Sequence, residues 1–157
     1  MEIKMKSLKH LLYISAIAGT IFVSSPVLAE IHVVEMLNKG EEGMMVFKPA
    51  VVFAEAGDTV QFKPTDKSHN VVSFNDMLPE GVESFKSKFN KEFELVVDKE
   101  GTYGYYCQPH LPLGMVGLIV VGDNIDITAV NLSSKAKGKA KKRLEKYIQE
   151  GALKDRG

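Results

Sequence analysis

The sequence is organised around CQPHLPLGM, residues 107–115, which places a thiol, an imidazole and a thioether within nine residues. Pro109, Pro112 and Gly114 disfavour a helix or a regular strand, so we expect this stretch to form a loop. Such a loop can fold around one ion. Thiolate and thioether are soft ligands and imidazole suits copper, so this mixture of donors favours copper over magnesium or calcium.

A fourth ligand is needed beside Cys107, His110 and Met115. His69 is the best candidate, because it follows a polar turn at residues 65–68 and opens an apolar run. Two His and one Cys with a long, weak axial Met form the donor set of a blue-copper electron-transfer site. Taken alone, the cysteine could be a small buried hydrophobe and the upstream histidine an ordinary turn residue. Their combination favours a metal site.

The first 29 residues have the composition of a secretory signal. Three lysines precede an apolar run over residues 11–23, and the small-residue site Val27-Leu28-Ala29 follows. Cleavage after Ala29 would leave residues 30–157 as a single exported domain. A membrane anchor is the alternative, but the apolar run is short for a membrane span.

Charge and cysteine content argue against several classes of protein. Residues 30–157 carry 17 basic and 19 acidic side chains, so no nucleic-acid partner is expected. The single Cys cannot form an internal disulfide, and outside the cytoplasm metal ligation is its most sensible use. Only three His follow residue 29, two of them already assigned, which is too few for a copper oxidase. No base remains beside the cysteine for a hydrolase, so an enzyme is not expected.

Short alternating or apolar segments separated by turns predict an all-β protein, a Greek-key β-sandwich of seven or eight strands. Pro49 predicts an edge, a bend or a bulge inside its segment. Residues 75–91 predict a long loop with one helical turn. The expected strands cover residues 31–38, 44–54, 59–63, 69–74, 92–97, 102–107 and 116–121.

Residues 123–157 change character and predict a mainly helical extension packed on the sandwich. We expect two short helices, one from Asp123 to Val130 and one capped by Ser133 or Ser134. The second would bury the side chains Ala140, Leu144, Tyr147 and Ile148 along one face. Its basic residues are expected to form a solvated face, with a docking helix as the alternative.

These motifs closely resemble the pseudoazurins, a family of cupredoxins. The likeness rests on the spacing Cys107-x-x-His110-x-x-x-x-Met115, on His69-Asn70, and on strings such as MLNKG at 36–40 and DMLPEG at 76–81. It implies one copper ion bound by His69, Cys107, His110 and Met115 in a β-sandwich. It also implies a periplasmic, monomeric one-electron carrier that shuttles between Cu(I) and Cu(II). Its partner would be nitrite reductase or a similar redox protein, or a cytochrome, and no membrane contact is expected after signal cleavage.

The resemblance also implies roles for the neighbours of the ligands. Asn70 would tie the two ligand-bearing loops together by hydrogen bonding, and Pro109 would stiffen the metal loop. Met45 would pack against a ligand imidazole, or else serve only as ordinary packing. Gln108 stands where relatives usually have Thr, which puts a bond from that side chain to Asn70 in doubt.

An electron carrier needs an exposed apolar patch at the edge of one ligand, and Leu111, Pro112 and Leu113 flank His110. This patch would be the docking face for the partner.

The resemblance places lysines around that patch. Lys39, Lys67 and Lys86 match the expected ring, whereas Tyr106 stands where some relatives have Lys. These lysines would steer an acidic partner, or else be ordinary solvated side chains. The alternative function is copper storage or delivery without redox cycling. Delivery proteins, however, hold Cu(I) at open sites rich in Met or Cys.

Overall fold

The structure, a computed structural model, describes residues 28–154. The predicted signal sequence lies outside these residues apart from Leu28 and Ala29, and so does the end of the chain from residue 155. Within the described part, no helix is both long enough and apolar enough to cross a membrane.

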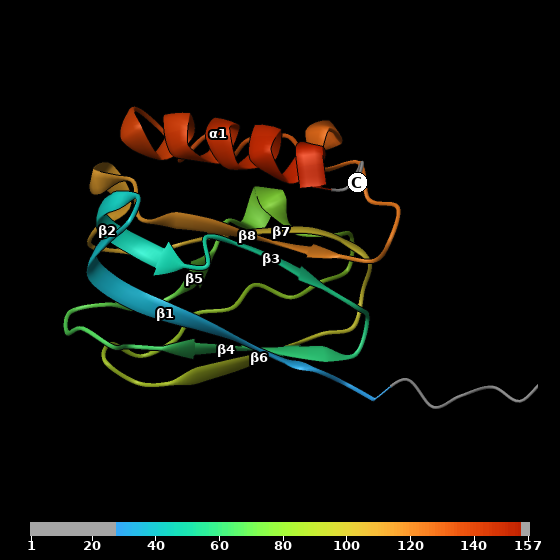
Figure 1. Cartoon of the computed structure of the whole chain (residues 1–157), viewed down its shortest axis with the longest axis horizontal. Helices are drawn as coiled ribbons and strands as arrows, with labels where there is room; N and C mark the ends of the chain where they lie inside the picture. Colours follow the sequence, from blue (N-terminus) through green and yellow to red (C-terminus); the bar gives the residue numbers. More distant parts are fainter. Residues whose placement is uncertain (1–27, 155–157) are drawn as a thin grey trace, which may run out of the picture.

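Within residues 28–154, eight strands form two four-stranded sheets that pack face to face, and one α-helix covers the outer face of the second sheet (Figure 1). The first sheet has the order β2-β1-β4-β6 and the second β3-β8-β7-β5. This confirms the predicted all-β sandwich. The strands are β1 (Ile31–Gly40), β2 (Gly43–Lys48), β3 (Val51–Ala54), β4 (Asp58–Lys63), β5 (Val72–Ser73), β6 (Phe93–Val97), β7 (Gly101–Tyr106) and β8 (Val116–Val121).

The segment predicted as one strand over residues 44–54 is two strands in different sheets. β2 pairs antiparallel with β1, whereas β3 pairs parallel with β8. Pro49 lies between them, as the prediction of a bend implied. Because proline has no N–H to donate to a strand ladder, the pairing ends here and the chain can pass from one sheet to the other.

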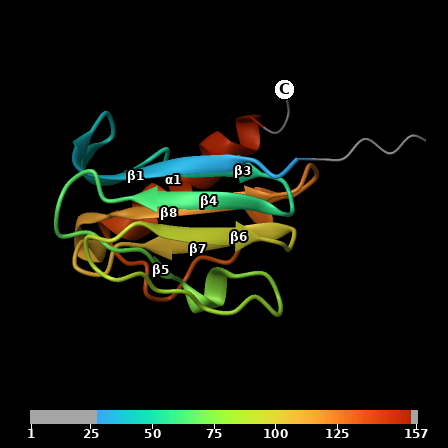
Figure 2. The same ribbon diagram turned by 90° about the horizontal axis from the view of Figure 1, so that it is seen from below.

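Aromatic rings fill the space between the sheets at the level of β4 and β7. Tyr105 makes edge-on contacts with Phe47 and Phe62, at ring-centroid distances of 4.9 and 5.1 Å. Gly117, paired with Tyr105 across β7 and β8, allows this ring to approach, since a Cβ at that position would lie 2.4 Å from the ring. Figure 2 shows β1, β4 and β6 side by side on the face of the sandwich away from the helix.

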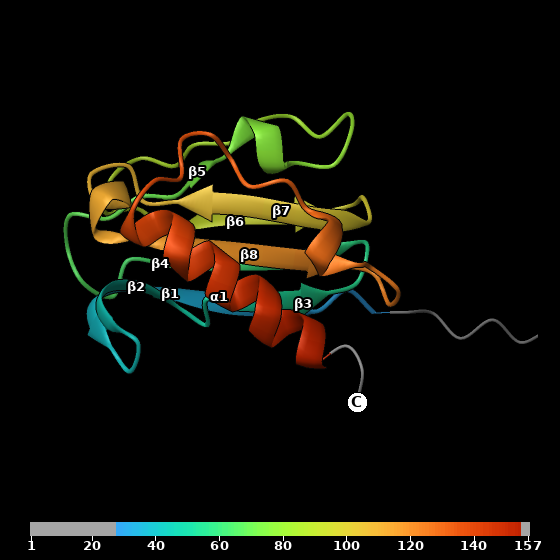
Figure 3. The ribbon, with the colours of Figure 1, turned by 90° about the horizontal axis from the view of Figure 1, so that it is seen from above.

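β8 is buried on both faces, which explains its continuous apolar sequence. Ile119 and Val121 belong to the core between the sheets, whereas Leu118 and Val120 pack beneath the helix. The helix α1 (Lys139–Lys154) crosses this outer face (Figure 3). It buries Ala140, Leu144 and Tyr147, and Ile148 is half-buried.

The C-terminal helices differ from the prediction in number and in bounds. The first is a single 3-10 turn, η3 (Ile127–Ala129), capped by Asp126 rather than Asp123. The side chain of Asp126 accepts a hydrogen bond from the N–H of Thr128, so the cap is three residues later than expected. Ser133 caps an isolated turn, and α1 begins only after Gly138, whose φ of +54° lies outside the helical region. Residues 123–154 therefore contain one α-helix, where two short helices were predicted.

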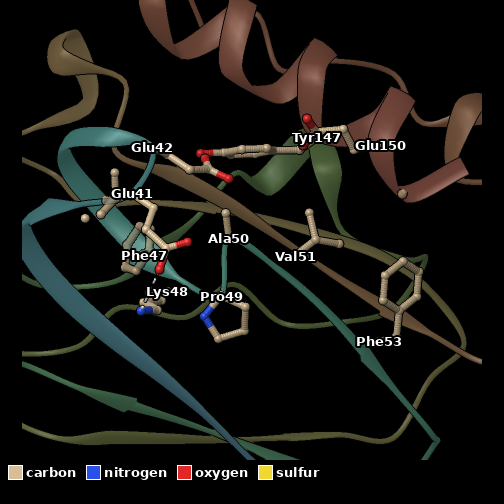
Figure 4. A pocket seen from close by; sticks show the side chains of 13 residues that line it. Glu41, Glu42, Phe47, Lys48, Pro49, Ala50, Val51, Phe53, Tyr147 and Glu150 are labelled. Carbon is tan, nitrogen blue, oxygen red and sulfur yellow. Dashed lines mark hydrogen bonds and ion pairs between the residues drawn. The ribbon is translucent and has the colours of Figure 1, made fainter. Parts of the chain in front are cut away.

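A hollow of about 290 Å³ lies between the β1–β2 hairpin, β3 and the second half of α1 (Figure 4). Pro49, Phe53 and Tyr147 are among the residues that line it. None of the predicted metal ligands is among them. The predicted metal site therefore lies elsewhere in the fold.

Candidate metal centre

The loop at residues 107–115 connects β7 to β8, which are neighbouring antiparallel strands. The N–H of Cys107 donates to the carbonyl of Met115 at 2.9 Å, and the N–H of Met115 donates to the carbonyl of His110 at 3.1 Å. These bonds close the loop and bring residues eight positions apart to its base. Within it, η2 (Leu111–Leu113) is a single 3-10 turn that Gly114 ends at a φ of +83°.

His69 comes from the loop between β4 and β5. Its carbonyl accepts a hydrogen bond from the N–H of Asn90 at 2.9 Å. The side-chain oxygen of Asn90 in turn accepts from the N–H of Ser68 at 2.5 Å. The backbone on both sides of the histidine is therefore held by a distant segment, and its side chain is completely buried.

Three donor atoms from the two loops face one another. Nδ1 of His69 lies 3.1 Å from Nδ1 of His110, and Sγ of Cys107 lies 3.4 Å from Nδ1 of His110 and 3.7 Å from Nδ1 of His69. Donors that share one first-row metal ion lie about 3–4 Å apart, because each is about 2.0–2.3 Å from the ion. The three atoms are thus spaced to bind one ion.

Met115 is the fourth residue of the predicted set. Its side chain is fully buried, in the same apolar cluster as Cys107. The hydrogen bond between the two backbones holds these residues next to each other at the base of the loop. The structure therefore brings together the two loops on which all four predicted ligands lie.

Burial sets the protonation of the donors. It lowers the pKa of His69, and the neighbouring His110 lowers it further. Burial also lowers the pKa of His110. Both imidazoles therefore favour the neutral form that binds metals. Burial raises the pKa of the Cys107 thiol, so a bound cation has to displace its proton.

The tautomer of His69 is fixed by Asn38, a residue that the sequence did not single out. The side-chain oxygen of Asn38 accepts a hydrogen bond from Nε2 of His69 at 3.0 Å. Nε2 therefore carries the proton. The lone pair of Nδ1, on the side of Cys107 and His110, is then free to bind a metal ion. Asn38 lies in the string MLNKG, residues 36–40, which resembles the pseudoazurins. This resemblance was the only feature of the sequence that pointed to it.

Asn70 lies between the two ligand-bearing loops and is fully buried. Its side-chain oxygen accepts a hydrogen bond from the backbone N–H of Gln108 at 2.9 Å and lies 3.8 Å from Sγ of Cys107. Its Nδ2 has no hydrogen-bond partner among residues 28–154. The side chain of Gln108 is exposed, as is Pro109, and Met45 is half-buried against the core between the sheets.

The surface beside His110 is apolar. Leu111 is half-buried, whereas Pro112 and Leu113 are exposed. His110 itself is only partly buried.

The three predicted lysines are all exposed and flank segments of the site. Lys39 follows Asn38, and Lys67 precedes His69 by two residues. Lys86 forms an isolated bridge with Val72 of β5, next to the segment that carries Asn70.

A β-sandwich that holds two His, one Cys and one Met at one end defines a cupredoxin, the class of proteins that carry a single blue copper ion. The family model for copper binding proteins of the plastocyanin/azurin family matches residues 34–122. The pseudoazurin of Paracoccus pantotrophus is 49% identical over 131 residues, which are 83% of this chain and 90% of that protein.

Two solved structures that this chain resembles are also pseudoazurins. The pseudoazurin of Methylobacterium extorquens AM1 is 42% identical with a TM-score of 0.71, over 76% of this chain and 98% of that one. The pseudoazurin of Hyphomicrobium denitrificans is 46% identical with a TM-score of 0.68, over 76% of this chain and 97% of that one. The chain belongs to the plastocyanin/azurin family of copper-binding proteins and, within it, to the pseudoazurins. It is a copper-binding electron carrier with redox proteins as partners, and it is not an enzyme.

Proposed function

We propose that the protein is a periplasmic, monomeric one-electron carrier whose copper ligands are His69, Cys107, His110 and Met115. The observation that carries this proposal is the convergence of three donor atoms, all within 4.8 Å of one another, at the end of a cupredoxin sandwich. The fully buried Met115 on the same loop supports its assignment as the axial ligand.

Bound copper would supply the one-electron step by cycling between Cu(I) and Cu(II). The side chains of this protein suit both states, because the thiolate also holds Cu(II) through a short covalent bond, the soft thioether favours Cu(I) and imidazole binds either. Asn38 orients the imidazole of His69, and Asn70 holds the loop that carries Cys107. Little rearrangement of the ligands is therefore needed when the electron moves. Pro109, Gln108 and Met45 are proposed to support the loop and the ligand imidazole.

His110 is proposed as the exit for the electron, since its ring is only partly buried. Leu111, Pro112 and Leu113 would form the docking face around it. Their mixture of exposed and half-buried apolar surface suits a transient contact with another protein.

The lysines at positions 39, 67 and 86 would steer an acidic partner toward this face. A nitrite reductase is the proposed partner, with a cytochrome as the alternative. Export through the signal at residues 1–29, with cleavage after Ala29, would place the domain 30–157 in the periplasm, where such partners work.

The visible spectrum of the copper-loaded protein tests the proposal. We expect an intense blue or green thiolate band that bleaches on reduction and returns on oxidation. Cys107→Ser should remove this band, because a hydroxyl cannot replace the thiolate. Tight copper binding by the unaltered protein without such a band would contradict electron transfer and favour copper delivery.

A further inference from the structure

Arg143 is a buried cation that the copper chemistry described above does not use. It lies on α1, with 7% of its surface exposed. Its guanidinium donates four hydrogen bonds, all of them to backbone carbonyls. Nη1 donates to Gly114 at 2.7 Å and to Met45 at 2.8 Å, and Nη2 donates to Met44 at 3.0 Å and to Glu42 at 3.3 Å.

The partners of this side chain are unusual for a buried arginine. A guanidinium stays charged in proteins, so burying it is unfavourable unless its donors are satisfied. Arg143 forms no ion pair with a carboxylate within residues 28–154. Its charge is balanced by carbonyl dipoles from two separate segments, and this arrangement fixes the positions of those segments.

One of these carbonyls belongs to the peptide unit that leads into Met115. The oxygen of Gly114 accepts from Arg143, and the N–H of Met115 in the same peptide unit donates to the carbonyl of His110. The carbonyl of Met115 then accepts from the N–H of Cys107. The peptide unit before the thioether is therefore held on one side by the metal loop and on the other by the helix.

Gly114 is the residue that lets the helix come this close. A Cβ at this position would lie 2.9 Å from Cγ of Lys139 and 3.2 Å from Cδ of Arg143, and its φ of +83° also favours glycine. The other three carbonyls lie on the β1–β2 hairpin, in the opposite sheet. One side chain thus joins α1, the hairpin and the metal loop. Glu42 and Tyr147, which face each other in Figure 4, belong to the same contact of hairpin and helix.

We propose that Arg143 is a positioning residue of the copper site, which holds the Gly114–Met115 peptide unit and thereby the axial thioether. The inference rests on the proposed role of Met115 as axial ligand. The family model ends at residue 122, before α1. With this role for Arg143, the C-terminal helix contributes to a site whose other residues lie in the sandwich that the family shares. The helix then acts as part of the copper site as well as a cover for the sheet.

The variants Arg143→Gln and Arg143→Lys test this inference. In the copper-loaded protein, both should change the relative intensities of the thiolate absorption bands, because Met115 is held less firmly in each. Arg143→Gln should also lower the reduction potential, because it removes a buried positive charge that favours Cu(I). Arg143→Lys keeps the charge but cannot span four carbonyls, so it should give a smaller shift of potential. If Arg143→Gln does not fold, Arg143→Lys still reports on the bands.

Leu144→Ala is the matched control. Leu144 is the next residue on α1, is fully buried and packs against the sheet, so its loss weakens the same helix. This variant should be destabilised but should keep the bands and the potential of the unaltered protein. If it changes the bands as much as the Arg143 variants do, Arg143 has only a structural role and the inference is wrong.

A second readout needs no copper. In the metal-free protein, amide hydrogen exchange at Met115 should be about tenfold faster in Arg143→Gln, because local opening of the loop becomes easier. Leu144→Ala should not show this increase relative to the amides of β8. Unchanged exchange in Arg143→Gln would contradict the inference even if copper binding failed for another reason. Failure of the thiolate band in the unaltered protein would instead contradict the proposed function.

Discussion

The side-chain oxygen of Asn38 accepts a hydrogen bond from Nε2–H of His69 at 3.0 Å, and this contact joins β1 to the loop that carries the histidine. Asn38 is itself held, since its N–H donates to the carboxylate of Asp66 at 2.7 Å. The orientation of a proposed copper ligand thus depends on a strand 31 residues away in the sequence. Outer partners of this kind orient a ligand and tune its basicity.

Asn38→Ala should therefore weaken copper binding while leaving the thiolate band in place. Losing an outer hydrogen bond to a metal-bound histidine typically reduces metal affinity by about 10–100-fold. Competition with a chelator of known affinity measures the effect, and Lys39→Ala is the control because it alters the adjacent exposed side chain. Equal affinities of the two variants would show that Asn38 does not support the site.

Met115→Gln should keep the metal but lower the reduction potential. An oxygen donor favours Cu(II), whereas the thioether favours Cu(I). Voltammetry of the copper-loaded protein gives the potential directly. Met77→Leu is the control, since Met77 is also buried but belongs to the cluster beneath α1. A potential that does not move in Met115→Gln would mean that Met115 is not the axial ligand.

Gln108→Thr should stabilise the protein by about 1 kcal/mol, a typical net value for one hydrogen bond. Its hydroxyl is expected to accept from Nδ2 of Asn70, which is buried and has no partner among residues 28–154. Denaturant unfolding of the metal-free protein measures the change. Gln108→Val has the shape of threonine without the hydroxyl, so a similar gain in both variants would rule out the hydrogen bond as its cause.

Most strands could be predicted because their signals are local, although the segment predicted over residues 69–74 is a strand only at Val72–Ser73. Alternation, turn residues and the continuous apolar run of β8 all appear within short windows of sequence. The division of residues 44–54 between two sheets could not be predicted from local signals. Pro49 indicates a bend, but it does not indicate which strand the chain pairs with next. The first C-terminal helix was overpredicted, because a capping aspartate is a weak signal when little of the following segment is buried. Only Ile127 is fully buried within that turn.

All four candidate ligands could be predicted, three because they lie in one loop and His69 because it follows a polar turn and opens an apolar run. Cys107, His110 and Met115 are close in sequence, and the chemistry of their side chains indicates the metal. Asn38 and Arg143 could not be predicted, because each meets the site only through tertiary contacts, the second at sequence separations of 29 to 101 residues. Neither residue type indicates a role in binding copper.

Asp58 should make stability depend on pH in the acidic range. Hydrogen bonds from the N–H of Glu30, from His32 and from the N–H of Glu55 lower its pKa from 3.8 to about 2. A carboxylate whose pKa is lowered by folding stabilises the protein fully above its unfolded value, and this stabilisation is lost as the pH falls from 3.8 through about 2.

Asp58→Asn should accordingly reduce the free energy of unfolding at pH 6 by on the order of 2 kcal/mol. The difference from the unaltered protein should shrink toward pH 2. Denaturant unfolding of the metal-free proteins at several pH values measures it. Asp98→Asn, in the exposed turn after β6, is the control for the loss of one carboxylate. A difference that stays constant from pH 6 to pH 2 would contradict the assignment.

Reversing Lys39, Lys67 and Lys86 to Glu should slow electron transfer to an acidic partner without altering the copper spectrum. Electrostatic steering raises association rates by about 10–10³-fold, so a loss of at least about tenfold is expected at low salt. The rates should converge at high salt, because the screening length falls to about 3 Å at 1 M. Stopped-flow mixing of the reduced protein with a nitrite reductase measures both effects.

Each single reversal should be compared with Lys99→Glu, which changes the net charge equally. Lys99 lies in the turn between β6 and β7, at the end of β7 away from Cys107. If Lys99→Glu slows the reaction as much as the reversals at positions 39, 67 and 86 do, the effect comes from net charge alone. If only the reversals at positions 39, 67 and 86 slow the reaction, and only at low salt, these lysines steer the partner.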